Sequence, residues 1–238
     1  MPKDVFMFKQ FTIYQPYTDV MKVSTDSVLL GCFAEVSGFS NALDIGCGTG
    51  LLALMMAQKN PALHITAIDI HTNAYKCAVH NVQHSVFQRQ ITVFNISLKN
   101  FLDQSKILFD GIISNPPYFS QSLKSHKPEK NRYRHQEELE YEEVLMAAKN
   151  LLNPKGCLFL VVPYYERKRV DDGLLRNQLF IHRLMEVYAS TKKQQPYIYL
   201  LAIRKEKASS IKVERLYIRD SAGYYTWAYK EFTKDFYL

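Results

Sequence analysis

Two short segments of the chain carry residue types that could do chemistry. The first, Asn115-Pro116-Pro117-Tyr118, combines a carboxamide oxygen, a proline carbonyl and a flat aromatic face. Each oxygen can accept one N–H of a planar group bearing an NH2, which draws the nitrogen lone pair out of conjugation. The prolines stiffen the loop, and Tyr118 supports the ring. We therefore predict that Asn115, Pro116 and Tyr118 are catalytic residues that act on such an amine and, together with the cofactor site predicted at a second segment, transfer a methyl group to its nitrogen.

The second segment is a glycine-rich turn between a predicted strand and a predicted helix. It reads Leu43-Asp44-Ile45-Gly46-Cys47-Gly48-Thr49-Gly50-Leu51-Leu52, with glycines spaced two apart. Such a turn lets a ligand approach bare backbone, although glycines can also simply close a strand-to-helix turn. Leu51 stands where a dinucleotide-binding loop needs its third glycine, so pyrophosphate binding is disfavoured. The next predicted strand ends in Asp69, where related folds place an acid on ribose hydroxyls.

Strands and helices alternate from residue 41 to residue 163, which predicts an α/β fold with helices on both faces of a mostly parallel sheet. We expect strands at 41–45, 64–69, 91–94, 109–114 and 157–163, and helices at 51–59, 73–84 and 137–152. A turn is expected at 153–156. The carboxyl ends of parallel strands meet at one edge, and Gly46, Asp69, Asn95 and Asn115 all fall there.

The flanking regions are predicted to complete a single domain. Residues 1–40 form an N-terminal cap segment over the cofactor site, 41–205 the catalytic domain, and 206–238 a C-terminal strand and an aromatic tail. Thr25 or Asp26 can cap a helix in the N-terminal segment. After a helical stretch at 164–177, strands at 180–188 and 197–204 should pair as an antiparallel hairpin at the sheet edge, and 211–220 should add a strand. The aromatic side chains of the tail could stack on bases, but we expect most of them to dock the tail onto the domain.

Charge points to a polyanionic partner. The net charge is +7 and the pI is near 9.1. Basic residues cluster soon after Tyr118, at Lys124, Lys127, Lys130, Arg132 and Arg134, either as contacts to RNA phosphates or as a solvated loop. No apolar run reaches about 18 residues, so no membrane segment is expected. The four scattered cysteines indicate reduced thiols in a cytoplasmic protein. His80 and His84 have no evident third ligand, and we assign no metal.

The pattern Asp-x-Gly-x-Gly-x-Gly resembles the first motif of the class I S-adenosylmethionine-dependent methyltransferases. Further matches extend this resemblance over nearly the whole chain: Phe8-Lys9-Gln10-Phe11, Met21 to Gly31, Asn115 to Tyr118, Arg134-His135 and Asp235-Phe236-Tyr237-Leu238. Together they resemble the bacterial tRNA1(Val) adenine-N6 methyltransferase family. The resemblance implies a Rossmann-like class I methyltransferase fold, with a seven-stranded, mostly parallel sheet and an antiparallel edge strand. It also implies S-adenosyl-L-methionine as cofactor, S-adenosyl-L-homocysteine as product, and methylation of N6 of adenosine 37 in tRNA. We expect the protein to be a monomer.

The resemblance also assigns cofactor-binding residues. Lys22, Thr25 and Asp26 would lie near the methionine moiety. The remaining expected contacts come from the strand ends: Asp44, Gly46, Gly48, Gly50, Asp69, Ile70, Asn95, Ile96, Ser97 and Asn115. Ser97 is a departure, because relatives often carry an aspartate there for the adenine amino group.

Three other functions remain open at this stage. A protein glutamine N5-methyltransferase uses the same Asn-Pro-Pro-Tyr logic on a carboxamide, although it usually has a helical N-terminal domain and only about forty residues precede the glycine turn here. A guanine-N2 methyltransferase of rRNA or a DNA adenine methyltransferase is a second possibility. The third is a catalytically silent RNA-binding module, which is disfavoured because Asp44, the glycines and Asp69 are intact.

Overall fold

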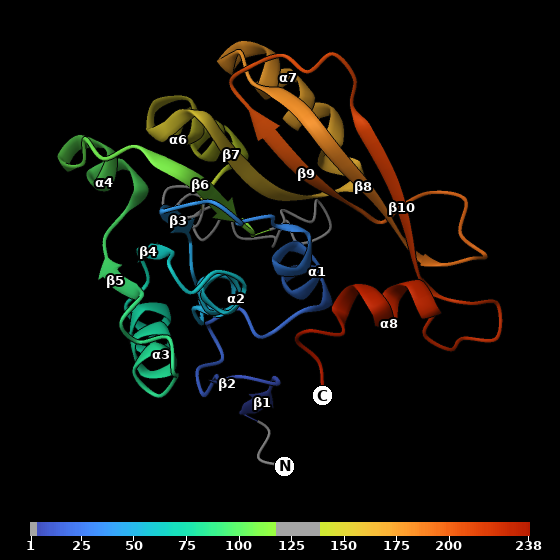
Figure 1. The fold of residues 1–238 in the computed structure, drawn as a ribbon, viewed down its shortest axis with the longest axis horizontal. Coiled ribbons are helices and arrows are strands. Elements are labelled where there is room, and N and C mark those ends of the chain that lie inside the picture. The colour runs from blue at the N-terminus through green and yellow to red at the C-terminus, as the bar shows by residue number, and fades with distance from the viewer. Residues whose placement is uncertain (1–3, 118–138) are drawn as a thin grey trace, which may run out of the picture.

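A central eight-stranded sheet organises the computed structural model, which describes residues 4–117 and 139–238 (Figure 1). Its strands are β3 (Asn41–Ile45), β4 (His64–Asp69), β5 (Ile91–Asn95), β6 (Phe109–Ser114), β7 (Leu152–Pro163), β8 (Phe180–Ser190), β9 (Ile198–Arg204) and β10 (Lys212–Arg219). They lie in the order β10-β8-β9-β7-β6-β3-β4-β5. The inner strands β3 and β6 are almost wholly buried, as their nearly continuous apolar sequences predict for a parallel sheet covered on both faces.

The predicted parallel α/β architecture is confirmed, with two corrections to the sheet. It has eight strands rather than seven, because β10 pairs in parallel with β8 and buries Leu216 and Ile218. The hairpin partners β8 and β9 do pair antiparallel, but β9 lies between β7 and β8 and not at the edge. Every strand other than β9 therefore points the same way, and all of those strands end at one edge.

Helices cover both faces of the sheet (Figure 1). One face carries α1 (Thr25–Phe33), α2 (Leu51–Lys59), α3 (Thr72–Gln83) and α8 (Trp227–Thr233). The other carries α4 (Leu98–Gln104), α6 (Tyr141–Leu151) and α7 (Arg167–Asn177), the last preceded by the 3-10 turn η2 (Tyr164–Glu166). No helix in the described ranges is both long enough and apolar enough to cross a bilayer.

Several local predictions differ from the structure. The N-cap of α1 is Ser24 rather than Thr25 or Asp26, because the Ser24 hydroxyl accepts from the backbone N–H of Ser27. The helix α4 was not predicted, and it begins at its cap Ser97. The turn expected at 153–156 belongs instead to β7, which starts directly after α6 and pairs irregularly with the start of β6.

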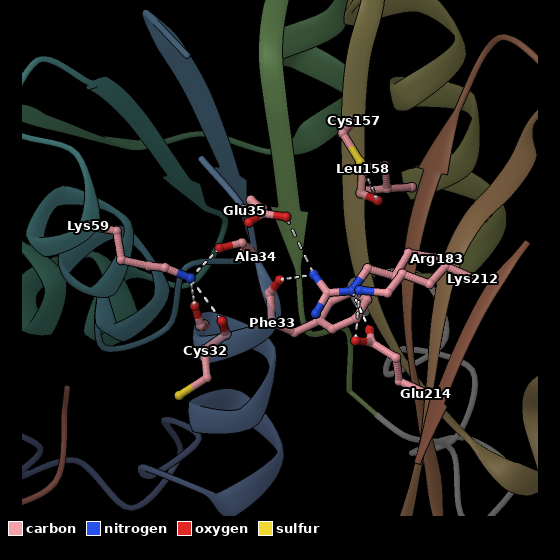
Figure 2. Close-up of polar contacts among 11 residues, drawn as sticks. Cys32, Phe33, Ala34, Glu35, Lys59, Cys157, Leu158, Arg183, Lys212 and Glu214 are labelled. Carbon is pink, nitrogen blue, oxygen red and sulfur yellow. Dashed lines mark hydrogen bonds and ion pairs between the residues drawn. The ribbon is translucent and has the colours of Figure 1, made fainter. Parts of the chain in front are cut away.

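Two basic side chains hold the C-terminal end of α1 against the rest of the domain (Figure 2). The Lys59 ammonium donates to the carbonyls of Gly31 (3.2 Å), Cys32 (2.8 Å) and Ala34. Arg183 of β8 donates to the Phe33 carbonyl and pairs with Glu214 at 2.5 Å, while its guanidinium lies 4.2 Å from the Phe33 ring centroid. Carbonyls that a helix end leaves without partners thus receive charged donors.

The N-terminal and C-terminal segments pack together on the α1–α2 face. The small antiparallel pair β1 (Val5–Met7) and β2 (Thr12–Tyr14) leads into this region. The Lys9 N–H donates to the Phe236 carbonyl at 2.9 Å, and the Phe8 ring stacks on Tyr237 with centroids 6.0 Å apart. Most of the tail aromatics do dock onto the domain: Tyr229 and Phe236 are buried, and Phe232 and Tyr237 pack against the same core.

Candidate active site

A cavity of about 490 Å³ opens at the carboxyl ends of β3, β4 and β6. Strand register explains why these ends converge: Ile45 of β3 pairs with Ile68 on one side and Ser114 on the other, and Asp69 pairs with Asn95. The residues that follow therefore emerge side by side. Of the predicted site residues, those that line the cavity are Lys22, Gly46, Gly48, Asp69, Ile70, Ile96, Ser97 and Asn115.

The glycine turn after β3 forms the floor of this cavity. Gly46 and Gly48 have φ values of 69° and 56°, a region that side chains disfavour. A Cβ on Gly46 would lie 3.1 Å from the Leu139 side chain, so the turn also has little room for one. The Gly46 N–H donates to the Ile68 carbonyl at 2.9 Å, which ties the turn to the end of β4. The sequence therefore leaves bare backbone facing the cavity.

Asp69 is the acid of this site and also braces the glycine turn. One carboxylate oxygen accepts from the Gly48 N–H at 2.9 Å and the other from the His71 N–H at 2.9 Å. Burial raises the pKa of Asp69, and these two backbone donors oppose that rise. Each oxygen keeps lone-pair capacity toward the cavity, because a carboxylate oxygen can accept more than one hydrogen bond.

Asn115 is held by Ser27 of α1. Its Nδ2 donates to the Ser27 hydroxyl at 2.8 Å, which fixes the carboxamide with nitrogen toward α1. Its Oδ1 is buried and has no hydrogen-bond partner in the described part of the chain. A buried acceptor without a donor is costly, so the oxygen is well suited to a ligand N–H.

The far side of the cavity is lined by Ile96 and Ser97. The Ser97 hydroxyl caps α4 by accepting from the Asn100 N–H at 3.2 Å. Asn95 does not line the cavity, because its amide donates to the carbonyls of Asp69 and Ile70, both at 2.9 Å. Asn95 therefore supports the Asp69 turn from behind.

The three residues expected near the methionine end fall in different places. Lys22 lines the cavity and lies 3.6 Å from Asp4 in an exposed ion pair. Thr25 and Asp26 do not line it. Asp26 instead accepts from the Tyr197 hydroxyl at 3.0 Å, which links the first turn of α1 to the sheet.

Three further predicted residues also lie outside the cavity lining. Asp44 is fully buried, and its carboxylate accepts from the Ala53 N–H at 3.1 Å, so it joins β3 to the first turn of α2. Gly50 is the N-cap of α2 and lies against Ala78. Pro116 is buried, whereas its neighbour Pro117 lines the cavity. Tyr118 and the basic run Lys124, Lys127, Lys130, Arg132 and Arg134 lie outside the described residues.

Sequence reasoning missed several residues that line the cavity. Ser27 stands inside the Met21 to Gly31 motif, but its role depends on its contact with Asn115, which is distant in sequence. Leu139 and Glu143 line the cavity as well. Leu139 precedes α6 and Glu143 lies in its first turn, and the capping box between Glu140 and Glu143 orients this wall. Within the described ranges, no group of three or more His, Cys, Asp or Glu gathers to hold a metal.

S-adenosyl-L-methionine fits this donor set. The bare glycine backbone suits the amino acid portion of the cofactor, and the Asp69 carboxylate suits its ribose. The apolar wall of Ile70 and Ile96 suits its flat base. Asn115 lines the same cavity, is joined to α1 through its Nδ2, and keeps an Oδ1 that has no partner among the described residues. One cavity thus offers a place for a nucleoside cofactor beside an acceptor for an incoming N–H.

Solved structures share this fold. A predicted O-methyltransferase from Agrobacterium tumefaciens matches with a TM-score of 0.68 at 14% identity, covering 89% of this chain and 96% of that one. Precorrin-6y C5,15-methyltransferase from Geobacter metallireducens matches with a TM-score of 0.56 at 14% identity, covering 82% and 94%. The fold and the cavity together define a class I S-adenosylmethionine-dependent methyltransferase.

Sequence comparison shows to which family within this class the chain belongs. The methyltransferase small domain model matches residues 23–185. A tRNA1(Val) (adenine(37)-N6)-methyltransferase from Phocaeicola vulgatus is 38% identical over 100% of this chain and 99% of its own length, and one from Flavobacterium johnsoniae is 35% identical over 98% and 99%. The chain belongs to the tRNA1(Val) (adenine(37)-N6)-methyltransferase family.

Proposed function

We propose that the protein methylates N6 of adenosine 37 in tRNA1(Val), with S-adenosyl-L-methionine as methyl donor, tRNA as its partner and a monomer as the working unit. The observation that carries the proposal is the buried Oδ1 of Asn115, which has no partner among the described residues and belongs to a residue that lines the cavity. The full-length relatives carry the substrate in their names.

The cofactor would be held by backbone and side chains from three strand ends. Gly46 and Gly48 would contact the methionine portion, with Lys22 available to its carboxylate, and Asp69 would accept from the ribose hydroxyls. Ile70, Ile96 and Ser97 would enclose the adenine. When bound, the cofactor supplies an electrophilic methyl on a sulfonium, which needs no activation by the protein.

The residues of the Asn-Pro-Pro loop prepare the nucleophile. An exocyclic amine is a weak nucleophile because its lone pair is shared with the ring. The Asn115 Oδ1 and the Pro116 carbonyl would each accept one N–H and leave the lone pair aimed at the methyl group. Tyr118 would stack on the base. No strong general base is required, because the methylated nitrogen becomes cationic and readily loses its proton.

Adenosine 37 is a reasonable target on physical grounds. A base in an anticodon loop is easier to unstack than one in a duplex, so extruding it costs at most a few kcal/mol. Lys124, Lys127, Lys130, Arg132 and Arg134 would contribute contacts to the RNA phosphates.

The test is mass spectrometry of nucleosides from tRNA incubated with the protein and isotope-labelled S-adenosyl-L-methionine. We expect labelled N6-methyladenosine, and none with Asn115→Ala, which should still bind the cofactor nearly as tightly because glycines and Asp69 are untouched. Labelled N2-methylguanosine, or no labelled nucleoside at all, would reject the proposed reaction. Normal turnover by Asn115→Ala would reject the role given to that side chain.

A further inference from the structure

Three exposed aromatic side chains gather directly after β10. Tyr224, Tyr225 and Trp227 are 73%, 45% and 78% exposed, whereas the aromatic residues that follow are buried or pack against the core. The Arg219 guanidinium lies 4.3 Å from the Tyr225 ring centroid, and Tyr225 stacks on Tyr229 at 4.8 Å, so the Tyr225 ring is held in place by its neighbours. Large aromatic surface left to solvent on a well-packed scaffold is typical of an interaction site.

The position of this group relates it to the active site. β10 and β8 run in the same direction as β6, so their carboxyl ends lie at the same edge of the sheet as Asn115. The Thr191 N–H donates to the Arg219 carbonyl at 2.9 Å, which joins the segment after β8 to the end of β10. Figure 1 shows these two connections side by side at one end of the molecule. Four strand spacings separate β10 from β6, a distance of about 19 Å.

The surroundings of the aromatic group are basic. Lys192 and Lys193, between β8 and β9, are exposed and make no ion pair within the described ranges. The neighbouring acid is Asp220, whose Oδ1 accepts from the N–H groups of Ala222 and Tyr224 and so holds the turn after β10 in place. The group therefore presents π faces and free ammonium groups together, which is the combination that single-stranded nucleic acid recognises.

We infer that this surface, formed by Lys192, Lys193, Arg219, Tyr224, Tyr225 and Trp227 and called here the edge patch, is a second contact for the tRNA. Unpaired bases stack on Trp227 and Tyr224, and the lysines hold adjacent phosphates. The inference rests on the proposed function, because the partner is the substrate whose adenosine enters the cavity. At 3.4 Å per nucleotide in a stacked strand, about 19 Å corresponds to roughly five or six nucleotides between the edge patch and the target base.

The aromatic part of the edge patch is tested by measuring the Kd for tRNA with Trp227→Ala, Trp227→Leu and Trp227→Phe. We expect Trp227→Ala and Trp227→Leu to raise the Kd about 5- to 100-fold, because both remove a stacking face, and Trp227→Phe to restore most of the affinity. The kcat and the affinity for S-adenosyl-L-methionine should stay at wild-type values. If Trp227→Leu bound tRNA as tightly as the wild-type protein, the contact would be apolar rather than a stacking contact, and the inference would be overturned.

The basic part is tested with Lys192→Ala combined with Lys193→Ala. This pair should lower the slope of log Kd against log salt by about 2. The matched control is Lys155→Ala combined with Lys207→Ala, which removes the same charge from exposed positions near the other ends of the strands and should leave the slope nearly unchanged. Equal slope changes in the two pairs would mean that only overall charge matters.

The outcome separates failure of the inference from failure of the proposed function. If the wild-type protein methylates tRNA and the Trp227 variants bind tRNA normally, the inference about the edge patch is rejected and the proposed function stands. A wild-type protein that yields no N6-methyladenosine would reject the function, while the Kd series still reports whether the edge patch binds RNA. Sedimentation will also show whether the protein is a dimer. If it is, and if Trp227→Ala dissociates the dimer, the edge patch binds a second copy of the chain and the inference is overturned.

Discussion

At the residue scale, the arrangement that matters most is one hydrogen bond. Ser27 accepts from the Nδ2 of Asn115 and so fixes the orientation of the carboxamide. The hydroxyl is buried, and it lies 3.0 Å from the Ser24 hydroxyl that caps α1. A single contact thus links the start of a helix to the acceptor oxygen of the proposed reaction.

Ser27→Ala should lower kcat for tRNA methylation by about 10- to 100-fold, because an Asn115 freed to rotate presents its acceptor in only part of its orientations. The KM for tRNA should change little, since Ser27 touches no expected RNA contact. Steady-state kinetics with Ser27→Thr as the conservative comparison will measure the split. A rise in the KM for tRNA with an unchanged kcat would contradict the role of Ser27 in positioning Asn115.

Asp44 should make the stability of the free protein depend on pH. Burial raises the pKa of Asp44 to about 7, well above its value near 3.8 in the unfolded chain. Between these values the folded protein holds a proton that the unfolded chain has lost, so the free energy of unfolding falls as pH rises from about 4 to about 7.

Comparison with Asp44→Asn isolates this effect. Relative to that variant, the wild-type protein should lose about 1 to 4 kcal/mol of stability across that window. Urea denaturation at several pH values will measure the difference. A difference between the two proteins that does not vary with pH would show that Asp44 stays ionised when buried.

At the element scale, α1 depends on a lysine from another helix. The Lys59 ammonium is the donor for three carbonyls at the end of α1, which carries Ser27 at its other end (Figure 2). Lys59→Met keeps the length of the side chain and removes the donor. The free energy of unfolding should fall by about 1 to 3 kcal/mol, measured by chemical denaturation.

The matched control is Lys149→Met, in the last turn of α6, where the lysine is exposed and the structure gives it no hydrogen bond. That change should stay within about 0.5 kcal/mol. Equal losses in the two variants would mean that the carbonyl contacts of Lys59 add nothing.

Prediction from sequence succeeded for elements whose signals are local. The strands 41–45, 64–69 and 109–114 and the helix 51–59 have the expected bounds, because apolar runs and flanking breakers mark them. The helix α4 was missed because seven residues with two charges carry little periodicity. The placement of β9 inside the sheet and the pairing of β10 depend on long-range contacts that no local pattern contains.

The candidate site shows the same division. Strand ends located Gly46, Asp69 and Asn115 at the cavity, since parallel topology fixes where such ends converge. Asp26 and Asn95 stand in the expected segments, but their side chains turn to Tyr197 and to the backbone of Asp69. Motif position therefore predicted the neighbourhood of a residue but not the direction of its side chain.

At the scale of the whole molecule, the positive charge should govern affinity for tRNA. Replacing Lys127, Lys130 and Arg132 by alanine should lower the slope of log Kd against log salt by about one for each lost phosphate contact. Alanine at Lys106, Lys155 and Lys207 removes equal charge from exposed positions. Filter binding across a salt series will compare the two triple variants, and identical slopes would reject a phosphate role for the run after Tyr118.

The meeting of the two chain ends has a consequence for biosynthesis. Phe8 and Lys9 are translated long before Phe236 and Tyr237, the two residues that receive them. The strands of the sheet can pair as they are translated, but the segment around Phe8 and Lys9 can dock only after Phe236 and Tyr237 have been translated. Because the same segment continues to Lys22 at the cavity, the enzyme should become competent to bind its cofactor only after translation of the last helix is finished.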